Sequence, residues 1–229
     1  AGGQITRWAE ADFVVDASGI GAAFARRLGV ARNRFDEVIS LCALYRLRED
    51  GDGAPAYTLV QTGELGWWYA ARLPHRKAIV SLCTDAETLK QDGLAEPAAW
   101  HRAFSASGWL ARECRRQFGA RLGVPGRLQP KAAPSAILSA VVGERWLAVG
   151  DAASSYDSMS SAGITKALIH AGMAGKALAD WLRDGSRSLL DAYQTRVFED
   201  FNTYLRLHQA HYRSETGYPR SGFWRRRRM

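Results

Sequence analysis

Residues 146–178 read WLAVGDAASSYDSMSSAGITKALIHAGMAGKAL, and this stretch decides the fold of the chain. An apolar run ends at Gly150 and Asp151, a Ser-rich polar loop follows, and a long helical pattern begins after Gly163. Open α/β sheets bind ligands at the carboxyl ends of their strands, so Asp151 is expected at such an edge, where a carboxylate accepts hydrogen bonds from hydroxyls. The alternative is a carboxylate that caps the next turn.

Gly163 is predicted to begin a helix, which leaves the backbone amides around Ala162, Gly163 and Ile164 as free donors at the positive end of the helix dipole. Such amides can stabilise partial negative charge on a ring carbonyl. The alternative is an ordinary helix start capped by Ser160 or Ser161. The combination of Asp151 and Gly163 across a fixed loop favours the ligand-binding interpretation.

The composition indicates a globular chain of one large or two small domains, with 229 residues of which 47% are hydrophobic and 24% charged. No apolar stretch is long enough for a membrane span, and residues 1–10 show no signal peptide. The three cysteines are far apart and form no disulfide framework or metal pair. These features predict a cytoplasmic protein.

The order of elements is predicted from hydrophobic periodicity. Residues 11–16 form a short buried strand that ends at Asp16, and a glycine turn and a short helix follow as far as Gly29. Short strand-like runs at 37–47, 56–61, 66–74 and 77–84 predict an antiparallel meander. Residues 85–119 are predicted to be helical, residues 123–136 a loop or extended segment, and residues 162–184 and 187–213 helical again.

Two stretches resemble motifs of the FAD-dependent aromatic hydroxylases and flavin-dependent halogenases. GDAASSYDSMSSAGITKAL resembles their "GDAA…DP.SS.G...AL" motif, although Ser158 stands where proline is usual. ADFVVDASGIGAAFARRLG resembles their "vvDAtGr" segment, where the chain passes the FAD. The resemblance implies that Asp151 contacts the ribityl hydroxyls and that the backbone at Gly163 faces the flavin pyrimidine. The implied cofactor-binding residues are Asp16, Gly19, Gly150, Asp151, Ala152, Gly163 and Ile164.

The resemblance implies an α/β (α+β) fold: the carboxyl-terminal part of a Rossmann-like FAD domain, an inserted antiparallel substrate sheet, and helices at the end. The expected segments are an FAD-domain segment at 1–35, a substrate-binding insertion at 36–125, a return to the FAD domain at 126–185, and helices with a basic tail at 186–229. The GxGxxG unit that cradles the pyrophosphate is absent, because SGIGAAFA lacks the third glycine. We therefore expect the chain to be the carboxyl-terminal half or more of a flavoprotein.

The substrate side is expected on the strand GWWYAARLP, which resembles a Trp-rich strand of the halogenase-like branch without meeting its WxWxIP pattern. Trp67, Trp68 and Tyr69 are the candidate substrate residues. Adjacent strand residues face opposite sides, so one tryptophan is expected at the substrate cavity and the other in the core. The alternative places both in the core.

The net charge of +8 is concentrated at the end of the chain, where residues 220–229 hold five arginines and no acid. Such a tail is either solvated or binds an anionic partner, and no nucleic-acid signature accompanies it. The sequence HYRSETGYPRSGFWRRRR resembles the end seen in the halogenase-like branch and in flavoproteins that mature protein-derived quinone cofactors. His208 and His211 have metal-ligand spacing, but surface packing is the favoured interpretation and no metal site is predicted.

The resemblance implies an FAD-dependent monooxygenase that acts through a flavin hydroperoxide on an aromatic substrate, either a small molecule or a tryptophan carried on a protein or peptide. Electrons would come from NAD(P)H or from a flavin reductase. No residue is assigned to catalysis. A flavin-dependent halogenase is the enzymatic alternative. The alternative of another class is a non-catalytic fragment or partner-binding module that lacks the pyrophosphate site.

Overall fold

The computed structural model describes residues 10–47, 57–118 and 122–228. The mixed helix-and-sheet class that the sequence predicts is confirmed. The chain divides into two compact units, one made of Ala1–Arg34 with Ser135–Tyr204 and the other of Phe35–Pro134 with Leu205–Met229. Each unit is therefore built from segments that are distant in sequence.

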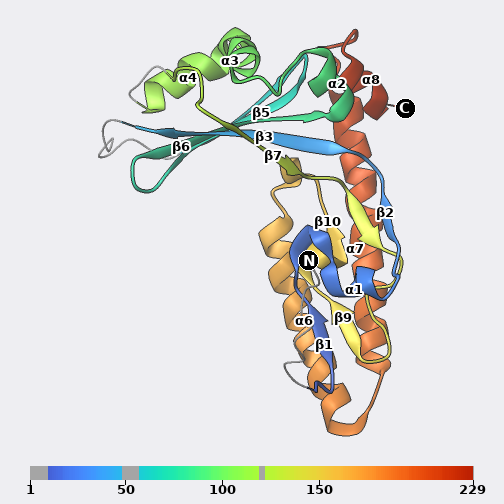
Figure 1. The fold of residues 1–229 in the computed structure, drawn as a ribbon. Coiled ribbons are helices and arrows are strands. Elements are labelled where there is room, and N and C mark those ends of the chain that lie inside the picture. Colours follow the sequence, from blue (N-terminus) through green and yellow to red (C-terminus); the bar gives the residue numbers. More distant parts are fainter. Residues whose placement is uncertain (1–9, 48–56, 119–121, 229) are drawn as a thin grey trace, which may run out of the picture. The chain divides into compact units, whose positions relative to one another are not determined.

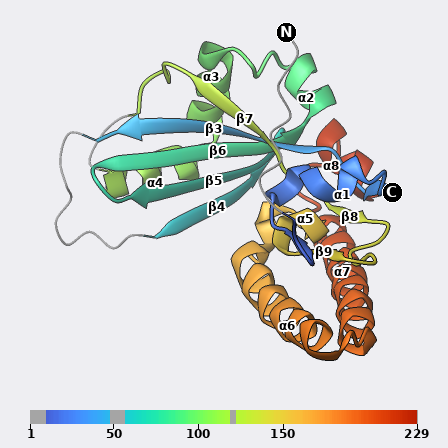
Figure 2. The same ribbon diagram turned by 60° about the horizontal axis from the view of Figure 1, so that its bottom comes forward.

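The first unit contains a parallel strand pair. Strand β1 (Val14–Asp16) lies beside β9 (Trp146–Ala148), with Asp16 opposite Ala148 (Figure 1). This pairing joins two segments that are about 130 residues apart in sequence. The helix α6 (Gly163–Asp184) and the first part of α7 (Ser188–Ser214) form an antiparallel hairpin in the same unit (Figure 2). Residues 187–213 thus lie almost entirely in one long helix.

Three very short strands in the first unit are not predicted by the sequence. They pair antiparallel in the order β10 (Ser154–Ser155), β8 (Ala136–Leu138) and β2 (Arg32–Arg34). Around them lie the short helical elements η1 (Gly19–Gly21), α1 (Ala23–Arg27), α5 (Gly150–Ala153) and η2 (Ser158–Ser160). Part of the predicted Ser-rich loop is therefore a helical turn and a strand rather than irregular chain.

The second unit is built on a five-stranded antiparallel sheet, as the meander pattern predicts. Its strand order is β4 (Thr58–Gly63), β5 (Gly66–Leu73), β6 (Lys77–Asp85), β3 (Val38–Arg46) and β7 (Leu128–Ala132). The turn between β5 and β6 consists of Pro74, His75 and Arg76, and both His75 and Arg76 have positive φ. The turn-rich residues 49–55 lie outside the described residues.

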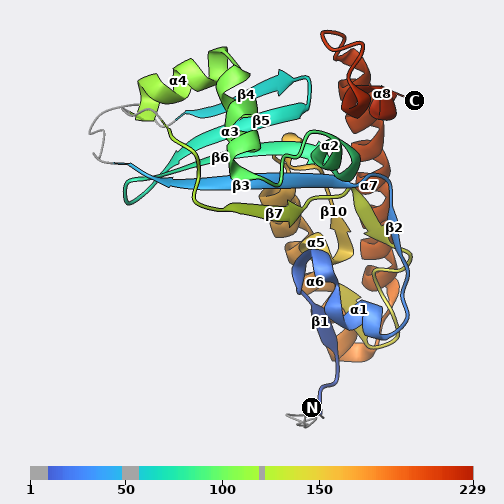
Figure 3. The same cartoon turned by 45° about the horizontal axis from the view of Figure 1, so that its top comes forward.

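Helices cover one face of this sheet. They are α2 (Ala86–Gln91), α3 (Pro97–Ala106) and α4 (Trp109–Phe118), and Pro97 occupies the first turn of α3 (Figure 3). Trp100 and Phe104 of α3 pack on Trp68 of β5, with ring centroids 5.3 and 5.8 Å apart. These three aromatic side chains are part of the hydrophobic core of the second unit.

The boundaries between the two compact units differ from the boundaries of the predicted segments. The expected return to the FAD domain begins at residue 126, yet β7 pairs with β3 of the second unit. The last turns of α7 and the helix α8 (Gly222–Arg228) also belong to the second unit. The functional labels of the segments stay predictions.

Candidate functional site

The two predicted motifs meet at the carboxyl ends of β1 and β9. The amide of Val149 donates to the carbonyl oxygen of Asp16 at 3.0 Å, which fixes the two strand ends side by side. The elements that follow these strands, η1 and α5, contact each other. The first unit therefore gathers Asp16, Gly19 and the Gly150–Ala153 turn at one edge, the place where parallel sheets bind ligands.

Asp16 uses its own carboxylate to shape this edge. One oxygen accepts from the amides of Phe24 and Ala25, both at 3.0 Å, and the other accepts from the amide of Ser18 at the same distance. Burial alone would raise the pKa of Asp16, but the hydrogen bonds from Ser18, Ala25 and Phe24 lower it overall. Asp16 thus caps α1, and both of its oxygens are already engaged.

The backbone at this edge has an unusual conformation. Gly19 has φ of +70° and Gly150 has φ of +57°, values that favour glycine whatever the space around it. Ala22 at +42° and Ser161 at +51° adopt the same region without being glycine. Non-glycine residues in this region gather at ligand-binding sites, where the surroundings hold the strain.

Asp151 presents a carboxylate that is partly available. Its side chain is 51% exposed, and its Oδ1 accepts from Lys166 Nζ at 3.0 Å. Among the described residues no hydrogen bond is found to Oδ2, so this oxygen can accept from a ligand hydroxyl. Ala152, the next residue, is fully buried and packs beneath the turn.

The amino end of α6 is open, as the motif predicts. Ala162 occupies the cap position without a side-chain hydrogen bond. The serine-cap alternative does not describe this helix, because Ser160 Oγ instead accepts from the amide of Ala162 at 3.3 Å. Ile164 is 80% exposed, so the first turn of this 22-residue helix can approach a ligand with its free amides.

The candidate substrate residues lie in the second unit, and their positions do not test the predicted role. Trp68 is buried against Trp100 and Phe104. Trp67 lies on the opposite face of β5, is also buried, and donates through Nε1 to Tyr212 Oη at 3.2 Å. Tyr69 is half-buried. Substrate contact by these three residues stays a prediction.

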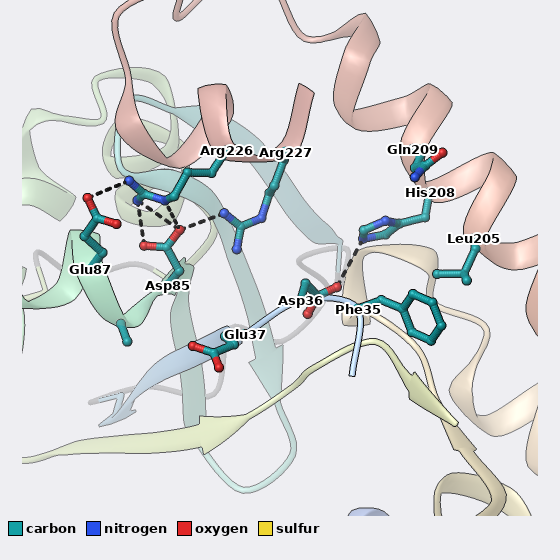
Figure 4. A pocket seen from close by; sticks show the side chains of 11 residues that line it. Phe35, Asp36, Glu37, Asp85, Glu87, Leu205, His208, Gln209, Arg226 and Arg227 are labelled. Carbon is teal, nitrogen blue, oxygen red and sulfur yellow. Dashed lines mark hydrogen bonds and ion pairs between the residues drawn. The ribbon is translucent and has the colours of Figure 1, made fainter. Parts of the chain in front are cut away.

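A cavity of about 510 Å³ lies within the second unit, at the start of β3 and of α2 (Figure 4). Its titratable lining residues are Asp36, Glu37, Asp85, Glu87, His208, Arg226 and Arg227. Arg226 and Arg227 of the basic tail both bind Asp85, at 2.8 and 2.7 Å. These two arginines therefore anchor the tail to the sheet, which neither alternative for the tail anticipates.

His208 and His211 do not share a ligand site. His208 Nε2 lies 3.8 Å from Asp36 Oδ2, and His211 is exposed. Within the described parts of the chain, no group of three metal-binding side chains comes together. The same residues include no helix long and apolar enough to cross a membrane.

Two basic residues at the site are not found by the sequence reasoning. Arg32 donates to the carbonyl oxygens of Asp151 and Ala152 at 3.0 and 3.1 Å. Lys166 approaches the same turn from α6. A signal for Lys166 is present, because it lies on the same helical face as the buried Ala174 and Ala177.

Comparison with solved structures gives the class of fold. No protein-family model matches the chain. The myxobacterial chondrochloren halogenase CndH superposes with a TM-score of 0.73 and 20% identity, over 95% of this chain and 50% of CndH. The chain therefore shares the fold of this FAD-dependent halogenase, and two relatives of higher identity confirm the predicted resemblance to flavin-dependent enzymes.

Two relatives are more similar in sequence. LodB of Marinomonas mediterranea, described as an FAD-dependent oxidoreductase, is 29% identical over 219 residues, which are 94% of this chain and 56% of LodB. QhpG, a peptidyl tryptophan dihydroxylase essential for tryptophylquinone cofactor biogenesis, is 27% identical with a TM-score of 0.76, over 96% of this chain and 49% of QhpG. The chain thus spans about half the length of these relatives.

Proposed function

We propose that this chain forms the part of an FAD-dependent monooxygenase that holds the ribityl chain and the pyrimidine side of the flavin. The observation that carries the proposal is the meeting of two features in the first unit, the half-exposed Asp151 carboxylate and the open amino end of α6. A carboxylate oxygen suits ribityl hydroxyls, and free amides at a helix dipole suit a ring carbonyl.

The residues of this chain would bind and orient the flavin, while the bound flavin supplies the oxygen chemistry. Gly19 and Gly150 let the backbone approach the cofactor because neither carries a side chain there. Asp16 acts indirectly, since both its oxygens hold the turn that precedes α1. The electrons come from NAD(P)H or from a separate reductase.

The proposed substrate is an aromatic group, in particular a tryptophan within a peptide or protein. The relation to QhpG, which is a peptidyl tryptophan dihydroxylase, supports this choice. A flavin-dependent halogenase is the second candidate, favoured by the similarity of fold to CndH. Mass spectrometry of a tryptophan peptide, incubated with the protein, reduced flavin, oxygen and bromide, separates the two: added oxygen supports hydroxylation, and added bromine supports halogenation.

The proposed flavin site is tested with two ligands that differ in one part. Riboflavin carries the isoalloxazine ring and the ribityl chain, whereas lumiflavin carries the same ring with a methyl group in place of the ribityl chain. Loss of a hydrogen bond to a charged group costs about 1.5–3 kcal/mol, which corresponds to roughly 10- to 100-fold in affinity. We therefore expect Asp151→Ala to weaken riboflavin binding by at least about tenfold and to leave lumiflavin binding unchanged.

Fluorescence titration measures both affinities, and Asp191→Ala is the matched control because Asp191 is an exposed aspartate of α7. An equal loss of affinity for both ligands would show that Asp151 does not bind the ribityl chain. Absence of flavin binding by the unaltered chain would oppose the proposal and favour a non-catalytic, partner-binding module.

A further inference from the structure

Lys166 connects the two halves of the proposed flavin site. It lies in the first turn of α6, and its Nζ reaches back to the segment that follows β9. There it donates to Asp151 Oδ1 at 3.0 Å and to the carbonyl oxygen of Ser154, and it approaches the carbonyl oxygen of Gly150 at 3.5 Å. An ammonium has three donors, so these three acceptors match its full capacity.

The Lys166 ammonium also contacts an aromatic ring. Its Nζ lies 4.4 Å from the centroid of the Tyr156 ring, and Tyr156 stacks on Tyr204 with centroids 4.0 Å apart. Tyr204 Oη in turn accepts from the amide of Asp157 at 2.7 Å. The lysine therefore belongs to a packed network that continues into the segment between α5 and α6.

A buried ammonium that joins two elements carries a free-energy cost, because it loses its hydration. The Lys166 side chain is only 4% exposed, whereas its partner Asp151 is half exposed. Burial lowers the pKa of the Lys166 ammonium, and the Asp151 carboxylate opposes that shift. An apolar residue on this face of α6 would pack without that cost, but it would remove the donor that Asp151 Oδ1 and the carbonyl oxygen of Ser154 share.

We propose that Lys166 is a positioning residue, which fixes the Asp151 carboxylate and the Gly150–Ser154 backbone relative to the open amino end of α6. The inference rests on the proposed function, because it gives the orientation in which Asp151 meets a ribityl hydroxyl. With Oδ1 held by Lys166, the free Oδ2 is the oxygen that is offered to the ligand. Lys166 acts through Asp151 and has no assigned contact with the flavin.

The first readout is riboflavin affinity, measured by fluorescence titration of the whole chain. Lys166→Met keeps the length of the side chain and removes the charge, and we expect it to weaken binding about tenfold. Lys176→Met is the matched control, since Lys176 is an exposed lysine of the same helix. In the double variant with Asp151→Ala, the loss should equal that of Asp151→Ala alone. Additive losses, or unchanged affinity in Lys166→Met, would overturn the proposal.

The second readout is hydrogen exchange of residues 150–156, which needs no flavin. A positioning role predicts exchange at least about tenfold faster in Lys166→Met than in Lys176→Met, because the segment loses its tether. If the unaltered chain binds no riboflavin, the proposed function fails while hydrogen exchange still decides the role of Lys166. Unchanged exchange overturns that role. Circular dichroism checks folding, and Lys166→Gln, which keeps a donor, replaces Lys166→Met if the latter does not fold.

Discussion

The two units of this chain fix their backbones in different ways. In the first unit, charged side chains bind backbone groups directly: Asp16 holds amides, while Arg32 and Lys166 hold carbonyl groups of the 150–154 turn. In the second unit, aromatic side chains such as Trp68 and Trp100 pack between a regular sheet and its helices.

The difference follows from the backbone that each unit must hold. A regular sheet satisfies its own hydrogen bonds, so apolar packing is enough to stabilise it. The turns after β1 and β9 contain positive φ angles at Gly19 and Gly150 and have few partners in regular structure. Their backbone groups need side-chain partners, and those partners leave a defined edge for a ligand.

The largest effect on stability is expected from a substitution in the aromatic core of the second unit. Trp100 is fully buried, and its replacement by alanine removes a large side chain and leaves a cavity. We expect Trp100→Ala to lower the free energy of unfolding by about 3–5 kcal/mol. Denaturant unfolding followed by circular dichroism measures the change. Trp109 is 47% exposed, so Trp109→Ala is the control and should cost clearly less. Equal losses would contradict the assignment of the core.

The second unit could be predicted well because its signals are local. The runs at 37–47, 66–74 and 77–84 are strands, since apolar and β-branched residues separated by turn residues determine them within a short window. The strand β2 reads Arg-Asn-Arg and carries no such pattern. It pairs with β8, about a hundred residues away in sequence, so the pairing depends on tertiary structure that no local window contains.

The site could be predicted in position but only partly in detail. The strand ends, Asp151 and the open helix at Gly163 follow from the spacing of the motif. The engagement of both Asp16 oxygens could not be predicted, because it depends on where α1 begins. Lys166 was missed because a lysine in a helix is normally a solvated residue, and its burial depends on the turn that packs against it.

The second-largest effect on stability is expected at Asp85 of the second unit. Its carboxylate binds Arg226 and Arg227 and caps α2. Burial alone would raise the pKa of Asp85, but the hydrogen bonds from Thr88 and Arg227 lower it to about 2. A lowered pKa contributes stability above the unfolded value of 3.8, and this contribution is lost as the pH falls from about 4 to about 2.

We expect Asp85→Asn to lower stability at neutral pH by at most about 2 kcal/mol and to remove most of the loss between pH 4 and pH 2. Unfolding measured across this pH range gives both values. Glu87→Gln is the control, because Glu87 is 56% exposed and its carboxylate contacts Arg226 and Gln91 on the surface of the unit. An acid response in Asp85→Asn as steep as in the unaltered chain would assign the acid sensitivity to other carboxylates.

The smallest expected effect concerns a buried hydrogen bond in the second unit, where aromatic packing dominates. The question is how much this hydrogen bond contributes to the free energy of unfolding. Trp67 Nε1 donates to Tyr212 Oη at 3.2 Å, and both side chains are buried. A neutral hydrogen bond contributes about 0.5–1.5 kcal/mol, so the coupling between Trp67→Phe and Tyr212→Phe should fall in that range. A double-mutant cycle isolates this coupling from the volume that Trp67→Phe also removes. A coupling near zero would mean that packing alone holds Trp67, which would make the contrast between the units sharper. A coupling well above the range would mean that the second unit, too, depends on a buried polar network.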